Sequence, residues 1–362
     1  MGFFFKFAST SHASEFEAPI KVEPFLFDFE SRNNPSEFEI VFFIGGTRYR
    51  YGIGVDREKV IYEYLFAILN IREVTLFTRE GQTLEINPTY FKEGISRREF
   101  SRKNASFVST CAQNNGELAT RIVSAFKDII VTSGLLDQSI LTNELLQNDA
   151  SKARVVDFLK FADIQLNDLK METAIEDFSD IHDQDVKELF VRKYGFMDKK
   201  RVLFGHTVYS GGVPLEQTYI ESMDESSGTR KLFEYAAPII RTLDSGGTLF
   251  IDEFDTRLHP LMIEALIRLF NSAETNPTNA QLVVSCHAVN IMTNRIFRRD
   301  QIWFCEKDLL GATAMYSLLE FKENDKKSGV RNDASFSKNY LQGKYGAVPY
   351  LGAIYAQTKR TV

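Results

Sequence analysis

Two adjacent acidic residues, Asp252 and Glu253, follow the apolar run at residues 248–251 and are the side chains best suited to chemistry. A short run of strand-forming residues, with a turn before it and a helical pattern after it, is typical of a buried parallel strand. Packing alone gives no reason for acids there, because burying an unpaired carboxylate is strongly destabilising. Two carboxylates at a strand end are suited to hold a metal ion and to activate water. The alternative is a strand that merely enters an acidic turn.

A histidine ends the next strand-like run. Pro260 fits the first turn of a helix, and apolar residues then recur at helical spacing as far as Phe270. Residues 281–286 have the pattern of a second buried strand, which ends at His287. The sequence therefore predicts a strand–helix–strand unit with polar residues at the carboxyl ends of both strands, where open α/β sheets bind ligands. A lone histidine is often structural, but this position favours a functional role.

A third candidate lies upstream of both acids. Ser226, Ser227, Gly228 and Thr229 precede a helical pattern that covers residues 230–243. Small hydroxyl residues and glycine at a helix N-terminus leave backbone N–H groups free to bind an anion. The alternative is an ordinary serine N-cap.

These motifs, in this order, resemble a known family. Residues from about 23 to 352 resemble the bacterial ABC-class AAA family ATPases of abortive-infection and other anti-phage loci, which are related to the ATPase domains of overcoming-lysogenization-defect nucleases. The similarity includes Val22-Glu23-Pro24-Phe25, Phe38-Glu39-Ile40, Tyr49-Arg50-Tyr51-Gly52, Glu225-Ser226-Ser227-Gly228-Thr229, Leu249-Phe250-Ile251-Asp252-Glu253-Phe254-Asp255, Leu258-His259-Pro260 and Tyr340-Leu341-Gln342-Gly343-Lys344-Tyr345-Gly346-Ala347.

The resemblance implies ATP and Mg²⁺ as cofactors and a role for each motif. Asp252 is expected to help hold Mg²⁺, Glu253 to act as the base for the attacking water, and His287 to contact the γ-phosphate. Asp255 is expected to belong to the nucleotide site. Residues 226–229 correspond to the signature motif, which contacts the ATP of the other subunit in a dimer. Their Ser-Ser-Gly-Thr sequence departs from the common Ser-Gly-Gly-Gln form, which leaves the strength of that contact open.

One motif of the family is missing from the sequence. The chain contains no Gly-x-x-x-x-Gly-Lys-Ser/Thr, and Gly45-Gly46-Thr47 has the pattern of a hairpin turn. The family carries its phosphate-binding loop near the amino terminus with a helix after it, and residues 1–11 are similar to the end of that helix. We therefore expect the sequence to begin just past the loop, through truncation, a misassigned start or true loss. The 362-residue chain is expected to bind ATP weakly.

Composition is that of a globular protein. The chain has 362 residues, 44% of them hydrophobic, and a net charge of −6, which argues against a broad nucleic-acid surface. Its three cysteines, Cys111, Cys286 and Cys305, show no metal-ligand or disulfide spacing and suit a reducing compartment. No apolar run is long enough to cross a membrane. We expect a cytoplasmic protein without membrane contact.

Two charged clusters carry weaker hypotheses. One contains basic residues that could touch nucleic-acid phosphates, although the pattern favours a charged surface loop: Arg97, Arg98, Arg102 and Lys103. The other resembles a metal cluster by composition, although an acidic surface loop is the alternative: Asp177, Asp180, His182, Asp183 and Asp185.

The predicted architecture is an α/β fold of the ABC-type P-loop NTPase class, with a mixed central sheet, an antiparallel β subdomain and a helical lobe. We expect three parts, residues 1–110, 111–200 and 201–362. Alternation over residues 20–100 predicts an antiparallel meander, residues 115–195 have a helical pattern, and residues 301–318 a hairpin.

The expected function is that of an ATP-hydrolysing ABC-class ATPase, acting as a nucleotide-driven switch in bacterial defence. It would form a homodimer and act on a separate nuclease or toxin, because no nuclease domain follows residue 352. The alternative is a non-hydrolysing interaction subunit or an inactive fragment.

Overall fold

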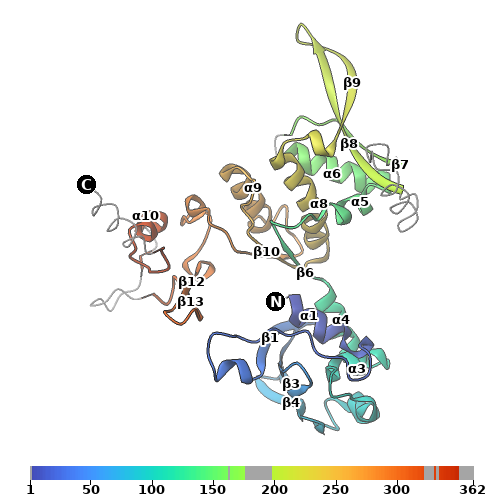
Figure 1. Cartoon of the computed structure of the whole chain (residues 1–362), viewed down its shortest axis with the longest axis vertical. Coiled ribbons are helices and arrows are strands. Elements are labelled where there is room, and N and C mark those ends of the chain that lie inside the picture. The colour runs from blue at the N-terminus through green and yellow to red at the C-terminus, as the bar shows by residue number, and fades with distance from the viewer. Residues whose placement is uncertain (1, 162–163, 176–197, 322–329, 332–333, 350–362) are drawn as a thin grey trace, which may run out of the picture. The chain divides into compact units, whose positions relative to one another are not determined.

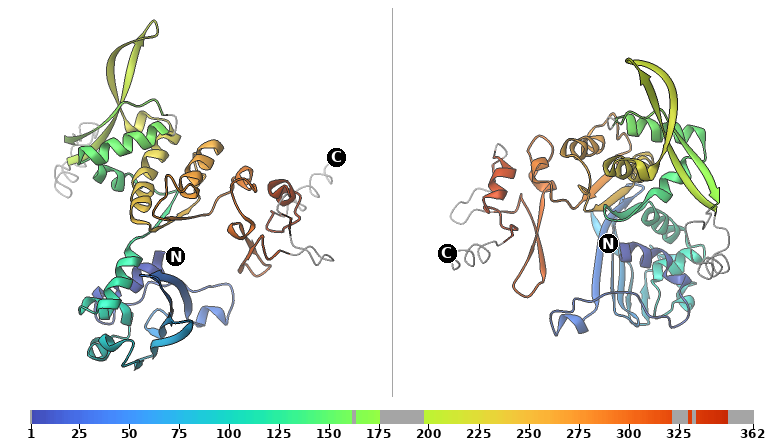
Figure 2. Two further views of the ribbon diagram at one scale, coloured as in Figure 1. Left: turned by 180° about the vertical axis from the view of Figure 1, so that it is seen from behind. Right: turned by 45° about the horizontal axis from the view of Figure 1, so that its top comes forward.

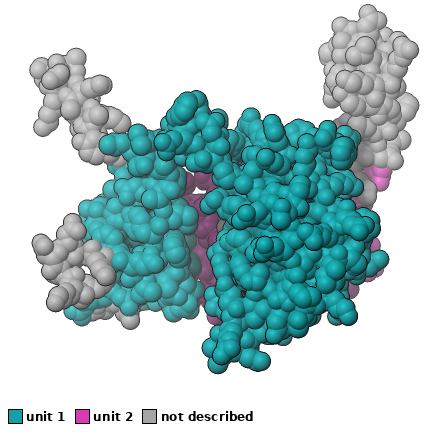
Figure 3. All heavy atoms as spheres, turned by 90° about the horizontal axis from the view of Figure 1, so that it is seen from below, with its two compact units in different colours: residues 1–131, 289–362 teal, residues 132–288 magenta. Residues whose placement is uncertain are grey.

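The computed structural model of the chain describes residues 2–161, 164–175, 198–321, 330–331 and 334–349. The chain divides into two compact units (Figure 3). One consists of residues 1–131 and 289–362, and the other of residues 132–288. No helix of the described residues is both long and apolar enough to cross a membrane.

The first unit is built on a five-stranded antiparallel sheet in the order β1-β2-β3-β4-β5, so the predicted meander is present (Figure 1). Gly45 and Gly46 close the first hairpin with φ values of 57° and 79°, which glycine adopts without strain. The prediction of a hairpin turn there is therefore confirmed. The strands are β1 (Ser36–Ile44), β2 (Thr47–Val55), β3 (Val60–Leu69), β4 (Arg72–Glu80) and β5 (Thr83–Ile86).

Helices cover one face of this sheet. The helix expected at the amino terminus is present as α1, and its Phe4 ring lies 5.9 Å from that of Tyr51 in β2. Phe126 of α4 lies 5.9 Å from the same tyrosine ring. Aromatic side chains therefore form much of this core. The helices of this part are α1 (Gly2–Thr10), α2 (Lys92–Ile95), α3 (Phe107–Gln113) and α4 (Glu117–Lys127), with 3₁₀ turns at Ser11–Ala13, Ser31–Asn33 and Arg98–Phe100.

A fully buried ion pair lies in this core. Glu63 and Arg79 are 3.5 Å apart, and neither side chain is exposed. The Glu63 carboxylate accepts hydrogen bonds from the backbone N–H groups of Phe107 and Val108, at 2.7 and 3.2 Å, so it caps α3. The Arg79 guanidinium donates to three backbone carbonyls. These partners offset only part of the desolvation, because burial still raises the pKa of Glu63 and lowers that of Arg79.

The later segment of the first unit contains the predicted hairpin. Strands β12 (Trp303–Lys307) and β13 (Thr313–Ser317) pair antiparallel, and α10 (Phe336–Leu341) follows. Phe304 and Phe336 are buried in a small apolar cluster of this segment. Two 3₁₀ turns precede the hairpin, at Val289–Ile291 and Arg299–Gln301.

The second unit contains the predicted strand–helix–strand motif. Strand β10 (Thr248–Asp252) pairs in parallel with β11 (Gln281–Val284), and α9 (Pro260–Asn271) connects them. The sheet order is β11-β10-β6, where β6 (Ile129–Ser133) spans the boundary of the two units. The prediction that both strands are buried is wrong for β11. Val283 is 46% exposed, because β11 is an edge strand of this sheet.

The helical pattern predicted for residues 115–195 is correct only in part. Helices α5 (Ser139–Leu145) and α6 (Asp149–Phe161) are present, but β6 and β7 (Asp168–Ile175) are strands. The β-branched residues of β6 favour an extended chain, and β7 is paired by a strand from far along the sequence. That sheet has the order β7-β8-β9, where β8 (Asp198–Ser210) and β9 (Val213–Glu221) form a hairpin. A 3₁₀ turn at Ser222–Asp224 follows.

Helix α8 (Ser227–Ser245) packs against α5, α6 and β10 of the second unit (Figure 2). It contains Pro238, which has no N–H to donate within the helix. The buried hydroxyl of Thr142, from α5, donates to the carbonyl of Phe233 at 2.8 Å and accepts from the N–H of Ala237 at 3.2 Å. The turn before the proline is therefore bridged by a side chain of another helix.

Candidate functional site

The carboxyl ends of β10 and β11 bring the predicted acids and the predicted histidine together. Ile251 lies level with Val284 in the parallel register, so Asp252 and Ser285 are the next residues out of each strand. The exposed Asp252 ends β10. Polar side chains of both strands therefore meet at one edge of the sheet, where α/β sheets bind ligands.

Ser285 holds both acids in place. Its hydroxyl donates to Oδ1 of Asp252 and accepts from the backbone N–H of Glu253 at 3.0 Å. Its carbonyl accepts from the N–H of Phe254 at 2.9 Å. Sequence reasoning missed this residue. The sequence carried no signal for it, because its role depends on the parallel register that places it level with Asp252.

The backbone of Glu253 is held in an unusual conformation. Its φ of 53° lies in the left-handed region, which is strained for a residue with a side chain. Gly134, just after β6, donates its N–H to the carbonyl of Asp252 at 2.7 Å. A Cβ at Gly134 would lie 2.1 Å from the carbonyl oxygen of Glu253. Only glycine fits so close to this turn, and Gly134 was also missed from the sequence.

Glu253 and His287 face each other across the strand ends. Oε2 of Glu253 lies 3.5 Å from Nε2 of His287, with the two side chains 35% and 84% exposed. Oδ2 of Asp255 accepts from the backbone N–H of His287 at 3.0 Å. Asp255 therefore positions the histidine through its main chain, while the carboxylate of Glu253 and the imidazole remain open to solvent. This pair can exchange a proton with a water or an anion bound beside it.

The predicted anion site lies at the start of α8. Ser226 is the N-cap, and its hydroxyl accepts from the N–H of Thr229 at 3.1 Å. Ser227 is exposed and Gly228 is half-buried, with a Cβ at Gly228 placed 3.2 Å from the carbonyl of Arg257. The serine N-cap foreseen as the simpler alternative is thus formed in this chain. Exposed Ser227 leaves the helix terminus accessible to a ligand.

The buried carboxylate of Glu225 holds the residues just before α8 in place. Oε1 of Glu225 lies 2.6 Å from Nε2 of His206 in β8, and only 9% of the Glu225 side chain is exposed. Nδ1 of the same imidazole lies 2.9 Å from the carbonyl oxygen of Gln165. A carbonyl only accepts, so Nδ1 of the ring donates there, and Nε2 faces the carboxylate of Glu225. The signature segment is therefore tied to the β8–β9 hairpin.

The donor set at the strand ends suits a shared Mg²⁺ site. Mg²⁺ in nucleotide sites takes one or two carboxylates and completes its coordination with phosphates and water. The exposed carboxylate of Asp252, beside the Ser285 hydroxyl, offers hard oxygen donors of this kind. No group of three or more acidic, histidine or cysteine residues able to hold a metal occurs among the described residues.

The basic cluster of the first unit has structural roles. The guanidinium of Arg97 donates to the carbonyls of Glu93, Asn114 and Asn115, at 2.5, 2.8 and 2.9 Å. Arg102 donates to the carbonyl of Ser14 at 3.1 Å. Lys103 pairs with Glu17. These contacts favour the alternative of a charged surface loop. The acidic cluster at residues 177–185 lies outside the described residues.

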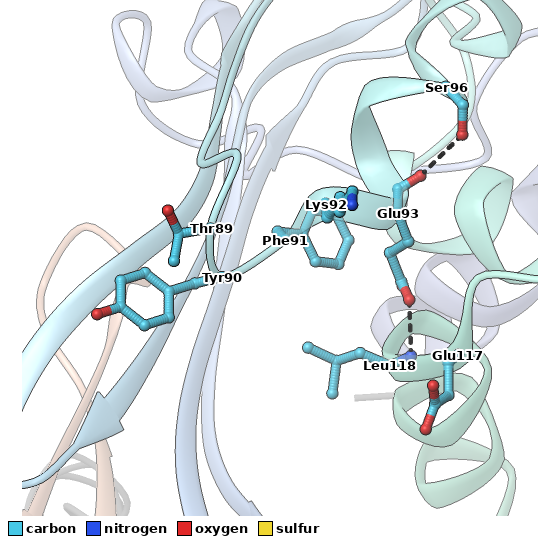
Figure 4. A pocket seen from close by; sticks show the side chains of 8 residues that line it. All are labelled: Thr89, Tyr90, Phe91, Lys92, Glu93, Ser96, Glu117 and Leu118. Carbon is cyan, nitrogen blue, oxygen red and sulfur yellow. Dashed lines mark hydrogen bonds between the residues drawn. The ribbon is translucent and has the colours of Figure 1, made fainter.

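A shallow hollow beside Arg97 is lined by two acids, Glu93 and Glu117, and Glu93 already caps a helix (Figure 4). Glu93 accepts from the backbone N–H groups of Leu118 and Ala119, at 3.0 and 2.9 Å, and so caps α4. The hollow is lined by Thr89, Tyr90, Phe91, Lys92, Glu93, Ser96, Glu117 and Leu118.

Comparison with known families agrees with an α/β fold. Residues 3–293 match the family described as "AAA domain, putative AbiEii toxin, Type IV TA system". The chain belongs to this family of AAA-type ATPase domains, because the match covers most of its length. A search of curated proteins found no match.

Proposed function

We propose that this chain is a nucleotide-hydrolysing ATPase of the ABC type, which acts as a switch on a separate effector in a toxin–antitoxin or abortive-infection system. The family supports nucleotide binding by an AAA domain. The observation that carries hydrolysis is the Glu253–His287 pair, 3.5 Å apart beside Asp252 at the ends of two parallel strands.

Each residue at the strand ends has a proposed task. Glu253 takes the proton of the attacking water, and its half-exposed carboxylate is accessible for this. His287, held by Asp255, donates a hydrogen bond to the phosphoryl group that is transferred. Asp252 helps hold Mg²⁺, which would neutralise charge on the phosphates when bound.

The proposed active form is a homodimer. In it, residues 226–229 of one subunit contact the nucleotide held at Asp252 and Glu253 of the other. The exposed Ser227 at the N-terminus of α8 supports this proposal, because free N–H groups there attract phosphate.

The test is a substitution that removes the base and keeps its shape. Glu253→Gln is expected to lower phosphate release at least about a hundredfold while Mg-ATP binding is retained. Binding is measured by calorimetric titration with Mg-ATP. Glu274→Gln, an exposed acid of the same unit, removes the same charge and should leave both quantities unchanged.

Two results would contradict the proposal. Unchanged phosphate release in Glu253→Gln would remove the catalytic role of this acid. A failure of the protein to bind Mg-ATP would favour the second candidate, a non-hydrolysing interaction subunit. One sequence observation favours that candidate, since the 362 residues contain no Gly-x-x-x-x-Gly-Lys-Ser/Thr motif to cradle the phosphates.

A further inference from the structure

The outward face of the five-stranded sheet in the first unit has an unusual composition. Side chains alternate between the two faces of each strand, and α1, α3 and α4 contribute to the core on the inward face. The outward face is open to solvent, with Val41 43% and Phe43 69% exposed. It is formed by side chains of β1, β2, β3 and β4 whose neighbours the strand register fixes.

Two neighbouring rows cross this face. Each has a glutamate on β1, a glycine on β2 and a tyrosine on β3. The first row continues to a second glutamate on β4 and the next row to a threonine. The rows are Glu37, Gly54, Tyr62 and Glu80, and Glu39, Gly52, Tyr64 and Thr78.

The glycines let both tyrosine rings lie flat on the sheet. A Cβ at Gly54 would lie 2.4 Å from the Tyr62 ring, and one at Gly52 would lie 2.2 Å from the Tyr64 ring. The two ring centroids are 6.2 Å apart with an interplanar angle of 4°. The rings therefore form one flat platform that a planar group can stack upon.

Carboxylates border this platform. Burial and a hydrogen bond to Glu37 raise the pKa of Tyr62 to about 12, so the phenol stays protonated and donates to the acid. Tyr64 donates to Glu39 in the same way. On this face the acids outnumber the arginines. Its charged residues are Glu37, Glu39, Glu73, Glu80, Glu85, Arg48 and Arg50. The face is therefore complementary to positive charge.

One guanidinium of the chain already occupies part of the face. Arg50 stacks over Phe66 at 4.5 Å and over Tyr64 at 5.5 Å. It also pairs with Glu39 at 3.2 Å and with Glu73. This arrangement shows that aromatic rings and glutamates on this sheet hold a guanidinium by stacking and by ion pairing together.

The row of Tyr62 has the same chemistry without a cation. Glu37 and Glu80 lie on either side of the ring, and neither pairs with an arginine or lysine among the described residues. We propose that this face is a docking site for a basic, arginine-bearing segment of a partner protein. A guanidinium of that segment stacks on Tyr62 and pairs with Glu37 and Glu80. This site is separate from the strand-end acids of the second unit and does not depend on nucleotide.

The test uses a labelled arginine–serine repeat peptide as the probe, with a glutamine–serine repeat as the uncharged control. Fluorescence anisotropy measures binding to the full chain without nucleotide. The double variant Glu37→Gln, Glu80→Gln is expected to weaken binding about tenfold, and Tyr62→Leu about fivefold. Tyr62→Phe keeps the ring and is expected to bind the arginine peptide nearly as well as the unaltered protein.

A matched control separates the site from general charge attraction. Glu15→Gln removes an exposed acid outside the sheet and should leave binding unchanged. Equal weakening by Glu15→Gln, or equal binding of the glutamine peptide, would overturn the proposal. A change of oligomeric state in the face variants, seen by sedimentation, would assign the face to a second copy of the chain and also overturn it. Tighter binding of single-stranded nucleic acid than of the arginine peptide would do the same.

Discussion

At the scale of single residues, the positions of Asp252 and Glu253 depend on Ser285, which has no proposed part in metal binding or proton transfer. The Ser285 hydroxyl contacts the carboxylate of Asp252 and the backbone of Glu253 at once. Glu253 keeps a left-handed φ, so its position depends on the contacts that hold the turn. Ser285 is therefore a positioning residue for both acids.

Removal of the Ser285 hydroxyl should lower the rate of phosphate release without destabilising the fold. Ser285→Ala is expected to lower phosphate release about tenfold, because the N–H of Glu253 and the Asp252 carboxylate each lose a partner. Since the site is exposed, the melting temperature should change little. Ser285→Thr restores the hydroxyl and should recover most of the rate. A rate in Ser285→Ala equal to that of the unaltered protein would refute the positioning role.

At the scale of elements, α8 receives backbone hydrogen bonds from a side chain of α5. Pro238 breaks the hydrogen-bond ladder of α8, and the Thr142 hydroxyl bridges Phe233 and Ala237 one turn earlier. Thr142→Val keeps the shape of the side chain but leaves buried polar groups of α8 without a partner. We expect a loss of about 1–3 kcal/mol in the free energy of unfolding, measured by urea denaturation. Thr120→Val, at an exposed position of α4, is the comparison and should cost far less.

A second link joins α6 to the β7-β8-β9 sheet. Asp168 in β7 accepts from Lys152 of α6 at 2.8 Å and from the Tyr219 hydroxyl of β9 at 3.0 Å. Burial opposes ionisation, but these hydrogen bonds outweigh it and hold the pKa of Asp168 below its ordinary value of 3.8.

This link should give stability that depends on pH. A carboxyl with a lowered folded-state pKa stabilises the fold above its unfolded pKa, and that contribution is lost as pH falls through the folded pKa. Asp168→Asn is therefore expected to cost about 1 kcal/mol at neutral pH, and the difference should shrink below pH 3.8. Denaturation of both proteins across this range measures it. A difference that stays constant with pH would contradict the assignment.

The sequence predicted elements with local patterns better than elements made by distant pairing. The alternation of β1 and β2, the hairpin turn at Gly45 and Gly46 and the proline at the start of α9 were all readable from neighbours in the chain. Strand β7 was not, because its partner lies beyond residue 197. The exposure of β11 was missed for a related reason, since an apolar run does not reveal whether a strand is central or at an edge.

The same limit applied to the site. The types and spacing of Asp252, Glu253 and His287 marked a strand–helix–strand unit, and the structure places them at neighbouring strand ends. Ser285 and Gly134 carry no motif of their own. Their importance depends on a parallel register and on a close backbone approach, which appear only once the sheet is formed.

At the scale of the whole molecule, the two kinds of chemistry lie in different units. The strand-end residues and the signature segment all belong to residues 132–288, which are continuous in sequence. The aromatic and acidic docking face belongs to the other unit, which is formed by segments before and after that insertion. Nucleotide chemistry and partner binding can therefore be altered separately by mutation.

The proposed dimer predicts that two inactive variants recover activity when their subunits are mixed. Ser227→Glu places a negative charge at the N-terminus of α8, which the helix tolerates but which repels a phosphate. Alone, this variant and Glu253→Gln should both be inactive. In a mixed dimer, one of the two sites combines an intact Glu253 with an intact Ser227 from the other subunit. An equal mixture should then recover about a quarter of the normal phosphate release, because about half of the dimers are mixed and each has one working site. No recovery after subunit exchange, with both variants folded by circular dichroism, would show that the signature does not act across subunits.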